Sequence, residues 1–201
     1  MDTNLDDIKH IRSMMERSSK FLSISGMSGV LAGTSAIVGA IVAYLVLEGR
    51  FTFTGSLLYD FILIAAVVLI SAVTAGLTLS ARKAKLSNAK LWQPVTLQIA
   101  KDFCVPLVIG GLFCIILIYK HVAYLVAPGM LIFYGLGLIA AGARTYRDVK
   151  ILGACEIILG LVAAVVVGYD LIFWAVGFGV LHIVYGILIY YKYDMKSAKN
   201  G

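Results

Sequence analysis

Residues 149–194 read VKILGACEIILGLVAAVVVGYDLIFWAVGFGVLHIVYGILIYYKYD, and this stretch decides the fold. It consists of two apolar runs joined by the short sequence Gly168-Tyr169-Asp170. Each run is close to the length that an α-helix needs to cross about 30 Å of hydrocarbon. The pattern therefore predicts two membrane-spanning helices joined by a tight turn.

The same composition extends along the whole chain. Of its 201 residues, 61% are hydrophobic and only 14% are charged, whereas about half of a soluble domain is apolar. This composition excludes an ordinary soluble protein, and no long polar or Pro-rich tract separates two domains. We expect residues 1–201 to form one all-α integral membrane domain in the lipid bilayer.

Six apolar segments are long enough to be spans, and they are joined in pairs by short connections. We therefore predict a polytopic protein of three consecutive helical hairpins. A shift of about fifty residues brings Gly110 onto Gly160 and Tyr134 onto Tyr185, which indicates that the later hairpins repeat. The predicted spans are about 21–47, 57–79, 103–119, 122–143, 151–167 and 171–191.

The segment before the first span, residues 1–20, places apolar side chains at helical spacing among charged ones. It is predicted to be an amphipathic helix on the cytoplasmic membrane surface. The alternative is an ordinary solvated helix that covers the ends of the bundle.

Basic residues predict the orientation. Of the 17 Lys and Arg residues, all but Arg50 and Lys120 fall on one side of the predicted membrane. By the positive-inside rule, both termini and the basic connection at 80–102 are cytoplasmic. Basic side chains beside the membrane are candidates for binding anionic lipid headgroups or a protein partner, although a solvated loop is the alternative. These candidates are Arg82, Lys83, Lys85, Arg144 and Arg147.

Two ionisable residues lie at membrane depth, where charge is costly and usually has a partner or a task. Glu156 shares a helix face with Gly153 and Gly160, and His182 shares one with Gly179 and Gly186. With the turn at 169–170, Glu156 lies level with position 183, because residues equally far from a turn have equal depth. The sequence therefore predicts a contact between Glu156 and His182.

The pair has two interpretations. A histidine beside a carboxylate can titrate near neutral pH and serve as a proton relay, an ion site or a substrate site. Alternatively, the pair is a satisfied polar clamp between two helices. Trp174 and Tyr185 could line a pocket beside the pair, but core and interface positions are the alternative for such aromatic residues.

No enzyme motif is present: the chain contains no GxSxG, HExxH or P-loop sequence. The three cysteines lie in apolar runs without ligand spacing, so we expect no metal site, no disulfide and no cofactor. The basic residues are not interleaved with stacking aromatics, so nucleic-acid binding is not expected.

Residues 14–33 (MMERSSKFLSISGMSGVLAG), 133–138 (FYGLGL), 151–160 (ILGACEIILG) and 173–193 resemble a family of uncharacterised bacterial six-helix inner-membrane proteins. A weaker resemblance is to the HdeD-type acid-stress membrane proteins, from which the long N-terminal segment and the basic connection depart. The resemblance implies a location in the bacterial inner membrane. It implies no activity.

Three functions follow as hypotheses. The first is a non-enzymatic membrane module that is structural, stress-related or partner-binding and that forms a homo-oligomer or binds another protein. The second is a small transporter or channel-like protein that uses Glu156 and His182. The third is a membrane enzyme acting on a lipid or isoprenoid.

Overall fold

A computed structural model describes residues 25–86 and 94–195, and all regular structure in these two ranges is helical. The predicted amphipathic helix at 1–20, the start of the first predicted span and part of the 80–102 connection lie outside the described residues.

The chain forms long helices joined by short turns. In order these are α2 (Gly26–Leu47), α3 (Leu57–Leu86), α4 (Pro94–Tyr119), the short η1 (Ala123–Leu125), α5 (Val126–Ala141) and α6 (Arg147–Val165). The last helical stretch is continuous and consists of α7 (Asp170–Trp174), η2 (Ala175–Leu181), α8 (His182–Ile189) and η3 (Tyr190–Asp194). We call this stretch the last helix. Its η2 and η3 segments are π-helical.

Five helices are long and apolar enough to cross a membrane: 26–47, 57–85, 94–119, 123–141 and 170–194. This finding supports the predicted class of membrane protein. The sixth, α6, has 19 residues, but Arg147, Asp148 and Lys150 occupy its first turn and Glu156 its middle. Both α3 and α4 extend beyond the predicted spans into the 80–102 connection, which is therefore largely helical where it is described.

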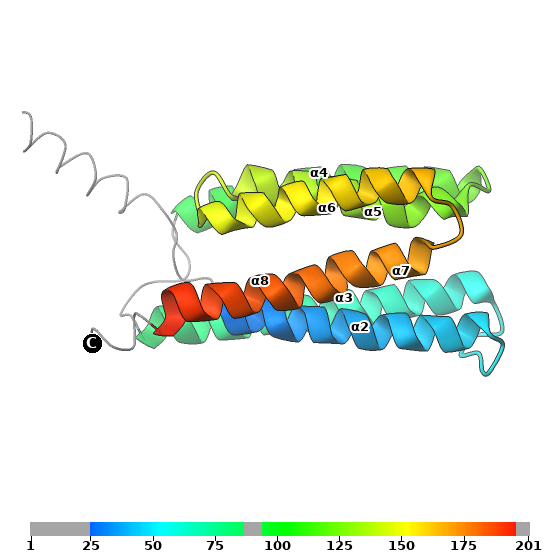
Figure 1. Cartoon of the computed structure of the whole chain (residues 1–201), viewed down its shortest axis with the longest axis horizontal. Coiled ribbons are helices and arrows are strands. Elements are labelled where there is room, and N and C mark those ends of the chain that lie inside the picture. Colours follow the sequence, from blue (N-terminus) through cyan, green and yellow to red (C-terminus); the bar gives the residue numbers. More distant parts are fainter. Residues whose placement is uncertain (1–24, 87–93, 196–201) are drawn as a thin grey trace, which may run out of the picture.

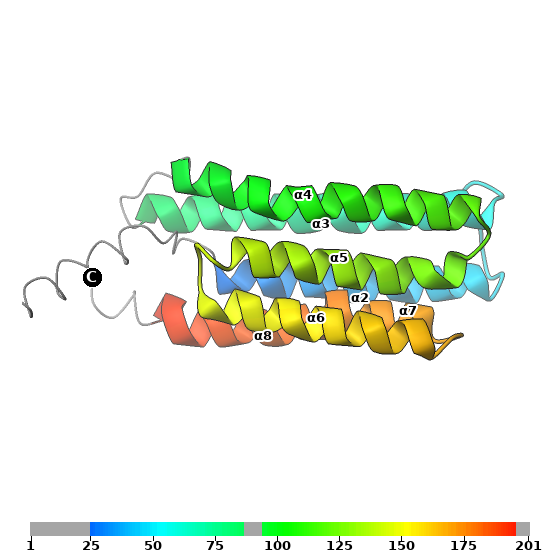
Figure 2. The ribbon, with the colours of Figure 1, turned by 90° about the horizontal axis from the view of Figure 1, so that it is seen from above.

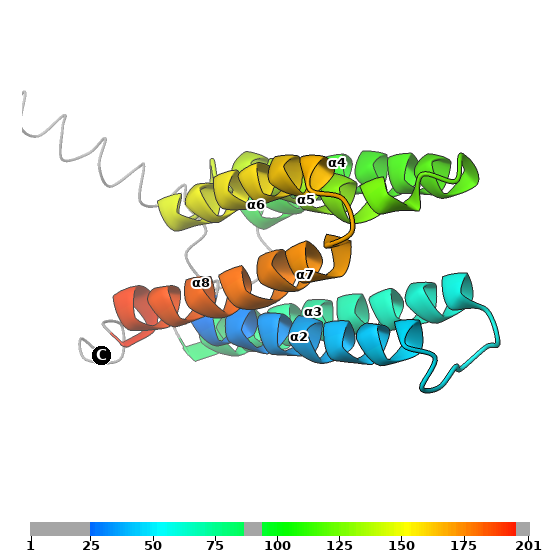
Figure 3. The ribbon, with the colours of Figure 1, turned by 45° about the vertical axis from the view of Figure 1, so that its right-hand side comes forward.

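The helices lie in two layers (Figure 1). One layer contains α4, α5 and α6, and the other contains α2, α3 and the last helix; Figure 3 shows the same division from another side. Seen from above in Figure 2, all the helices run along the same long axis. Thus α6 packs along α5, while the last helix packs mainly along α2. The two halves of residues 149–194 belong to different layers.

Glycine allows backbones to approach within each layer. A Cβ atom on Gly33 of α2 would lie 2.5 Å from the carbonyl oxygen of Gly179 in the last helix. In the other layer, a Cβ on Gly135 of α5 would lie 2.5 Å from the carbonyl oxygen of Gly153 in α6. Small residues at such crossings let membrane helices approach closely, and these glycines hold each layer together.

The turns at one end of the bundle use special backbone conformations. Gly49, Gly55 and Gly168 have positive φ angles, and so does His121 (φ 59°) in the three-residue connection between α4 and η1. Positive φ is uncommon for a residue with a side chain, although histidine adopts it more readily than most. The chain therefore reverses direction within a few residues, as the tight turns in the sequence predict.

Candidate functional site

Glu156 lies in the middle of α6 and is completely buried, with 0% of its surface exposed. The helix face that was predicted to point inward does so, because Gly153, Gly160 and Ala163 are buried with it. A carboxyl group on this face is removed from both lipid and water, so its surroundings in the protein decide its state.

The predicted contact between Glu156 and His182 is confirmed. His182 begins α8 in the last helix and is 7% exposed, and its Nδ1 lies 3.4 Å from Glu156 Oε1. The two residues come from different layers (Figure 1), and their contact joins α6 to the last helix, two helices that otherwise make few contacts with each other.

Both ring nitrogens of His182 have hydrogen-bond partners. Nδ1 lies 3.0 Å from the carbonyl oxygen of Gly177, and Nε2 lies 2.7 Å from the hydroxyl oxygen of Tyr134. A carbonyl oxygen can only accept, so this network assigns the ring proton to Nδ1. In the neutral imidazole, Nε2 is then unprotonated and accepts a hydrogen bond from the Tyr134 hydroxyl.

The carboxyl group of Glu156 is not satisfied in the same way. Neither Oε1 nor Oε2 has a hydrogen-bond partner within residues 25–86 and 94–195. Its neighbour Gly177 packs directly against the carboxyl group, since a Cβ there would lie 2.6 Å from Oε2. An ionised carboxylate without hydrogen bonds is costly in such surroundings, and this cost distinguishes Glu156 from an ordinary core residue.

The local form of the last helix positions these groups. Gly177 lies within the π-helical segment Ala175–Leu181, and His182 follows directly after it. The wider turn of a π-helix has a five-residue hydrogen-bond spacing, and such segments occur frequently at functional sites. Here the imidazole of His182 bonds the carbonyl five residues earlier in the chain.

Aromatic rings surround the polar group. Phe178 lies with its ring centroid 5.0 Å from that of Tyr134, and Trp174 lies 5.3 Å from Phe178. Trp174, a predicted site residue, thus contacts Phe178, which in turn packs against Tyr134 and His182. Tyr185, the other predicted aromatic, packs beside the cluster that includes Ile189 and is one helical turn from His182.

Sequence reasoning missed Tyr134 as a member of the site. Tyr134 lies in the middle of the predicted span 122–143 and directly precedes Gly135. A hydroxyl at that depth needs a hydrogen-bond partner, and this requirement was the available signal. This requirement does not identify His182 as the partner, because the sequence does not show that α5 faces the last helix.

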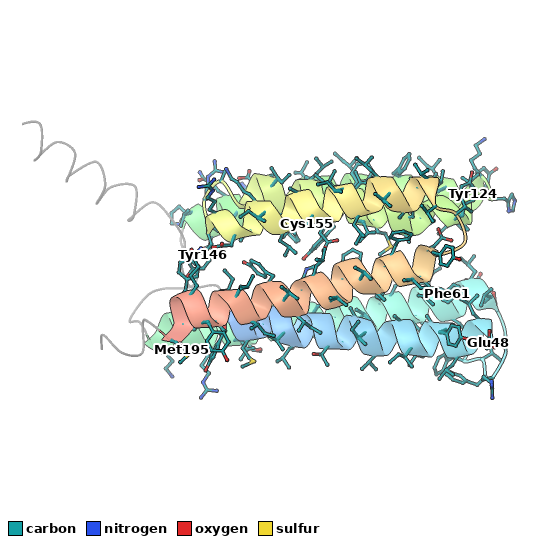
Figure 4. The ribbon with its side chains drawn as sticks, viewed as in Figure 1. Glu48, Phe61, Tyr124, Tyr146, Cys155 and Met195 are labelled. Atoms are coloured by element: carbon teal, nitrogen blue, oxygen red, sulfur yellow. The ribbon has the colours of Figure 1, made fainter. Side chains whose placement is uncertain are left out.

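A second polar cluster lies at the end of the bundle where α2 and α6 begin; we call it the basic-end network. Lys83 of α3 binds Asp194 Oδ1 at 2.7 Å, and Asp194 Oδ2 accepts a hydrogen bond from the Gly26 backbone N–H at 3.0 Å. Lys83 also lies 3.4 Å from the hydroxyl of Tyr146. Figure 4 shows Tyr146 between the two layers at this end.

The same network continues onto α6. The Tyr146 and Tyr193 rings stack with centroids 4.0 Å apart, while Lys192 and the Tyr193 hydroxyl each donate to Asp148 at 2.9 Å. Partial burial raises the pKa of Asp148, but the hydrogen bonds from Lys192 and Tyr193 together lower it by more. The pKa of Asp148 is therefore below its ordinary value. The network therefore ties the two layers together at this end.

The predicted headgroup-binding residues divide into two groups. Lys83 belongs to the basic-end network, and Arg144 forms an ion pair with Asp102 at the start of α4. Arg82, Lys85 and Arg147 have exposed side chains. Headgroup binding stays a prediction for all five.

At the opposite end, the loop after α2 folds over Asp60, whose exposed fraction is 0%. The carboxylate accepts hydrogen bonds from the hydroxyls of Thr52 and Thr54, both at 2.7 Å, and from the backbone N–H groups of Phe53 and Thr54. Asp60 therefore organises the loop before α3 and is not a free acidic group.

In the part of the chain that the structure describes, no three His, Cys, Asp or Glu side chains come together as a metal site. Comparison of the chain with protein-family models, curated proteins and solved structures finds no match.

Proposed function

We propose that this protein is a small transporter-like membrane protein in which ion binding at Glu156 and His182 is coupled to the relative position of the two helical layers. The observation that carries the proposal is the completely buried carboxyl group of Glu156, neither oxygen of which has a hydrogen-bond partner among the described residues. A group built only to hold helices together is expected to have its hydrogen bonds made.

The position of the pair supports coupling. Each layer is held together by glycine contacts between its own helices, whereas Glu156, Tyr134 and His182 meet across the layers. A change in the charge of Glu156 would alter one of the contacts that join the layers. In many transporters a substrate or ion site lies between two helical bundles, one of which rocks against the other.

The test is ion flux in liposomes that contain the purified chain. We expect pH-dependent proton or solute flux that Glu156→Gln abolishes while the folded yield and thermal midpoint stay near wild type. Glu48→Gln, which changes an exposed carboxylate at the end of α2, is the matched control. Loss of folded protein in Glu156→Gln, in step with any loss of flux, would instead identify a structural clamp.

A structural, stress-related or partner-binding membrane module is the second candidate. It is favoured by the basic-end network, in which side chains from α3, α6 and the last helix bind one another and secure both layers. This function predicts that the protein elutes with a stable partner or as a homo-oligomer from mild detergent. It also predicts that Glu156→Gln has no effect on flux.

We further propose a bacterial inner-membrane protein with six spans, a hairpin repeat and both termini in the cytoplasm. The resemblance to bacterial six-helix proteins supports the location. The clustering of Lys83, Arg144 and Lys192 at one end supports the orientation, and the exposed Arg82, Lys85 and Arg147 there would meet anionic lipid headgroups. Labelling of single cysteines with a membrane-impermeant reagent in intact cells tests the topology.

A further inference from the structure

We infer that the ion held at this site is a proton, that Glu156 carries it in the structure described above, and that Tyr134 is the positioning residue that keeps His182 from taking it. This inference rests on the proposed function and names its ion. It concerns three side chains from three helices: Tyr134 of α5, Glu156 of α6 and His182 of the last helix.

The distance between Glu156 and His182 can be compared with that of a charged pair. A charge-assisted hydrogen bond between an imidazolium and a carboxylate is short, about 2.7–2.9 Å. The observed separation of Nδ1 and Oε1 is 3.4 Å, and Nδ1 is directed to the Gly177 carbonyl oxygen at 3.0 Å. The geometry therefore fits a neutral imidazole beside a neutral carboxylic acid.

Tyr134 explains why the imidazole stays neutral. Its hydroxyl lies 2.7 Å from Nε2 and donates to that nitrogen, which cannot hold a second proton without reversing this hydrogen bond. The Tyr134 hydroxyl hydrogen would then need a new acceptor in a buried aromatic environment. Tyr134 thus keeps the ring proton on Nδ1 and leaves the exchangeable proton on Glu156.

The packing around Glu156 leaves a metal cation poorly accommodated. Oε2 faces Gly177 so closely that even a Cβ atom would be 2.6 Å away, and Oε1 faces the proton-bearing Nδ1 of His182. Hard cations bind several oxygen ligands together, whereas a proton needs only one oxygen. The shape of the site favours the smaller ion.

Release of the proton would reorganise the contact between the layers. The O–H bond of the Glu156 carboxyl breaks, the proton passes to a water molecule, and a carboxylate remains. This carboxylate attracts the Nδ1–H of His182, so the hydrogen bond shifts from the Gly177 carbonyl oxygen to Oε1 and the pair contracts. The π-helical segment that contains Gly177 loses one hydrogen bond, and the last helix moves relative to α6.

The titratable groups that face Glu156 are few. Tyr134 faces it from α5 and His182 from the last helix, and Tyr185 is near enough to Tyr134 to interact with it electrostatically. Tyr185→Phe is therefore the matched control for Tyr134→Phe, since both variants remove the hydroxyl of a partly buried tyrosine.

Infrared difference spectroscopy and nitrogen NMR of the full chain in lipid test the inference. We expect a protonated carboxyl C=O band that disappears as pH rises, is lost in Glu156→Gln and is unaffected by sodium or potassium chloride concentration. The His182 nitrogen shifts should report the Nδ1–H tautomer in wild type and Tyr185→Phe. A mixture of tautomers is expected in Tyr134→Phe.

The outcomes separate this inference from the proposed function. A Glu156-dependent band that titrates in a protein without flux would keep the proton assignment and overturn the transport function. A band that responds to sodium or potassium at constant pH, or a carboxylate at every pH, would overturn the proton assignment even if flux is observed. An Nε2–H tautomer in wild type would overturn the role of Tyr134.

Discussion

Glu156 and His182 lie 3.4 Å apart between Oε1 and Nδ1 although their helices belong to different layers. After the turn at Gly168 the last helix packs mainly along α2, and it meets α6 again at this pair and in the basic-end network. Changes at this contact should alter function more than fold, whereas changes at the glycine crossings should do the reverse.

The first prediction concerns Gly177. A Cβ atom there would lie 2.6 Å from Glu156 Oε2 and 2.4 Å from Leu131 Cδ2, so Gly177→Ala must displace two buried side chains. Because both clashing atoms are side-chain ends that can shift, we expect a loss of about 1 kcal/mol in stability, at the low end for overpacking. Although the protein should still fold, we expect flux to be largely lost, because the added methyl group moves the Glu156 carboxyl group away from His182.

The measurement for Gly177→Ala is flux together with the thermal midpoint in detergent. Gly76→Ala is its control, because a Cβ on Gly76 of α3 would meet no atom within 4 Å. Equal effects of the two substitutions on flux would contradict the prediction.

A second prediction concerns the crossing of α2 and the last helix. A Cβ on Gly33 would lie 2.5 Å from the Gly179 carbonyl oxygen and 2.8 Å from the Ile183 backbone nitrogen, and neither backbone atom can move aside alone. We expect Gly33→Ala to destabilise the protein by about 1–3 kcal/mol or to prevent folding. Its control is Gly111→Ala on α4, where a Cβ would contact nothing. A Gly33→Ala protein as heat-stable as Gly111→Ala would show that the helices are farther apart.

The loop after α2 provides a third prediction. Asp60→Ala removes the acceptor shared by Thr52, Phe53 and Thr54, so the hydroxyl and backbone N–H groups of this loop lose their hydrogen bonds to the carboxylate. We expect a lower thermal midpoint and faster protease cleavage within residues 48–56. Thr52→Val, which removes only one of these donors, should have a smaller effect. Unchanged cleavage in Asp60→Ala would contradict the assigned role.

The basic-end network provides a prediction about pH. The folded state lowers the pKa of Asp148 below its unfolded value, which is near the ordinary value of about 3.9. Its contribution to stability is therefore complete above that value and is lost as pH falls through the folded pKa. Asp148→Asn should be less stable than wild type at neutral pH, and the difference should shrink below about pH 4. Thermal unfolding across this range checks the sign, and a difference that grows on acidification would contradict it.

The level of Glu156 and His182 along the bundle was predictable from the sequence. Apolar runs of spanning length predicted helices, and counting residues from the turn at 169–170 placed Glu156 level with position 183, one residue from His182. This succeeds because a helix advances by a constant 1.5 Å per residue, so distance along the chain converts directly into depth. The small residues beside Glu156 also indicated its inward face correctly.

Which helices lie side by side could not be predicted from the sequence and is known only from the tertiary structure. Nothing in the spacing of apolar residues states that α6 packs along α5 while the last helix packs along α2, because helices of equal length and polarity can be arranged around one another in many ways. For this reason the sequence did not predict that Tyr134 contacts His182. It also did not predict the π-helical turn that brings the Gly177 carbonyl oxygen to the imidazole. Residue counting along the sequence predicted that Glu156 and His182 lie at the same level of the bundle. The close glycine contacts of the folded chain decided which residues at one level meet, since they select the neighbours of each helix.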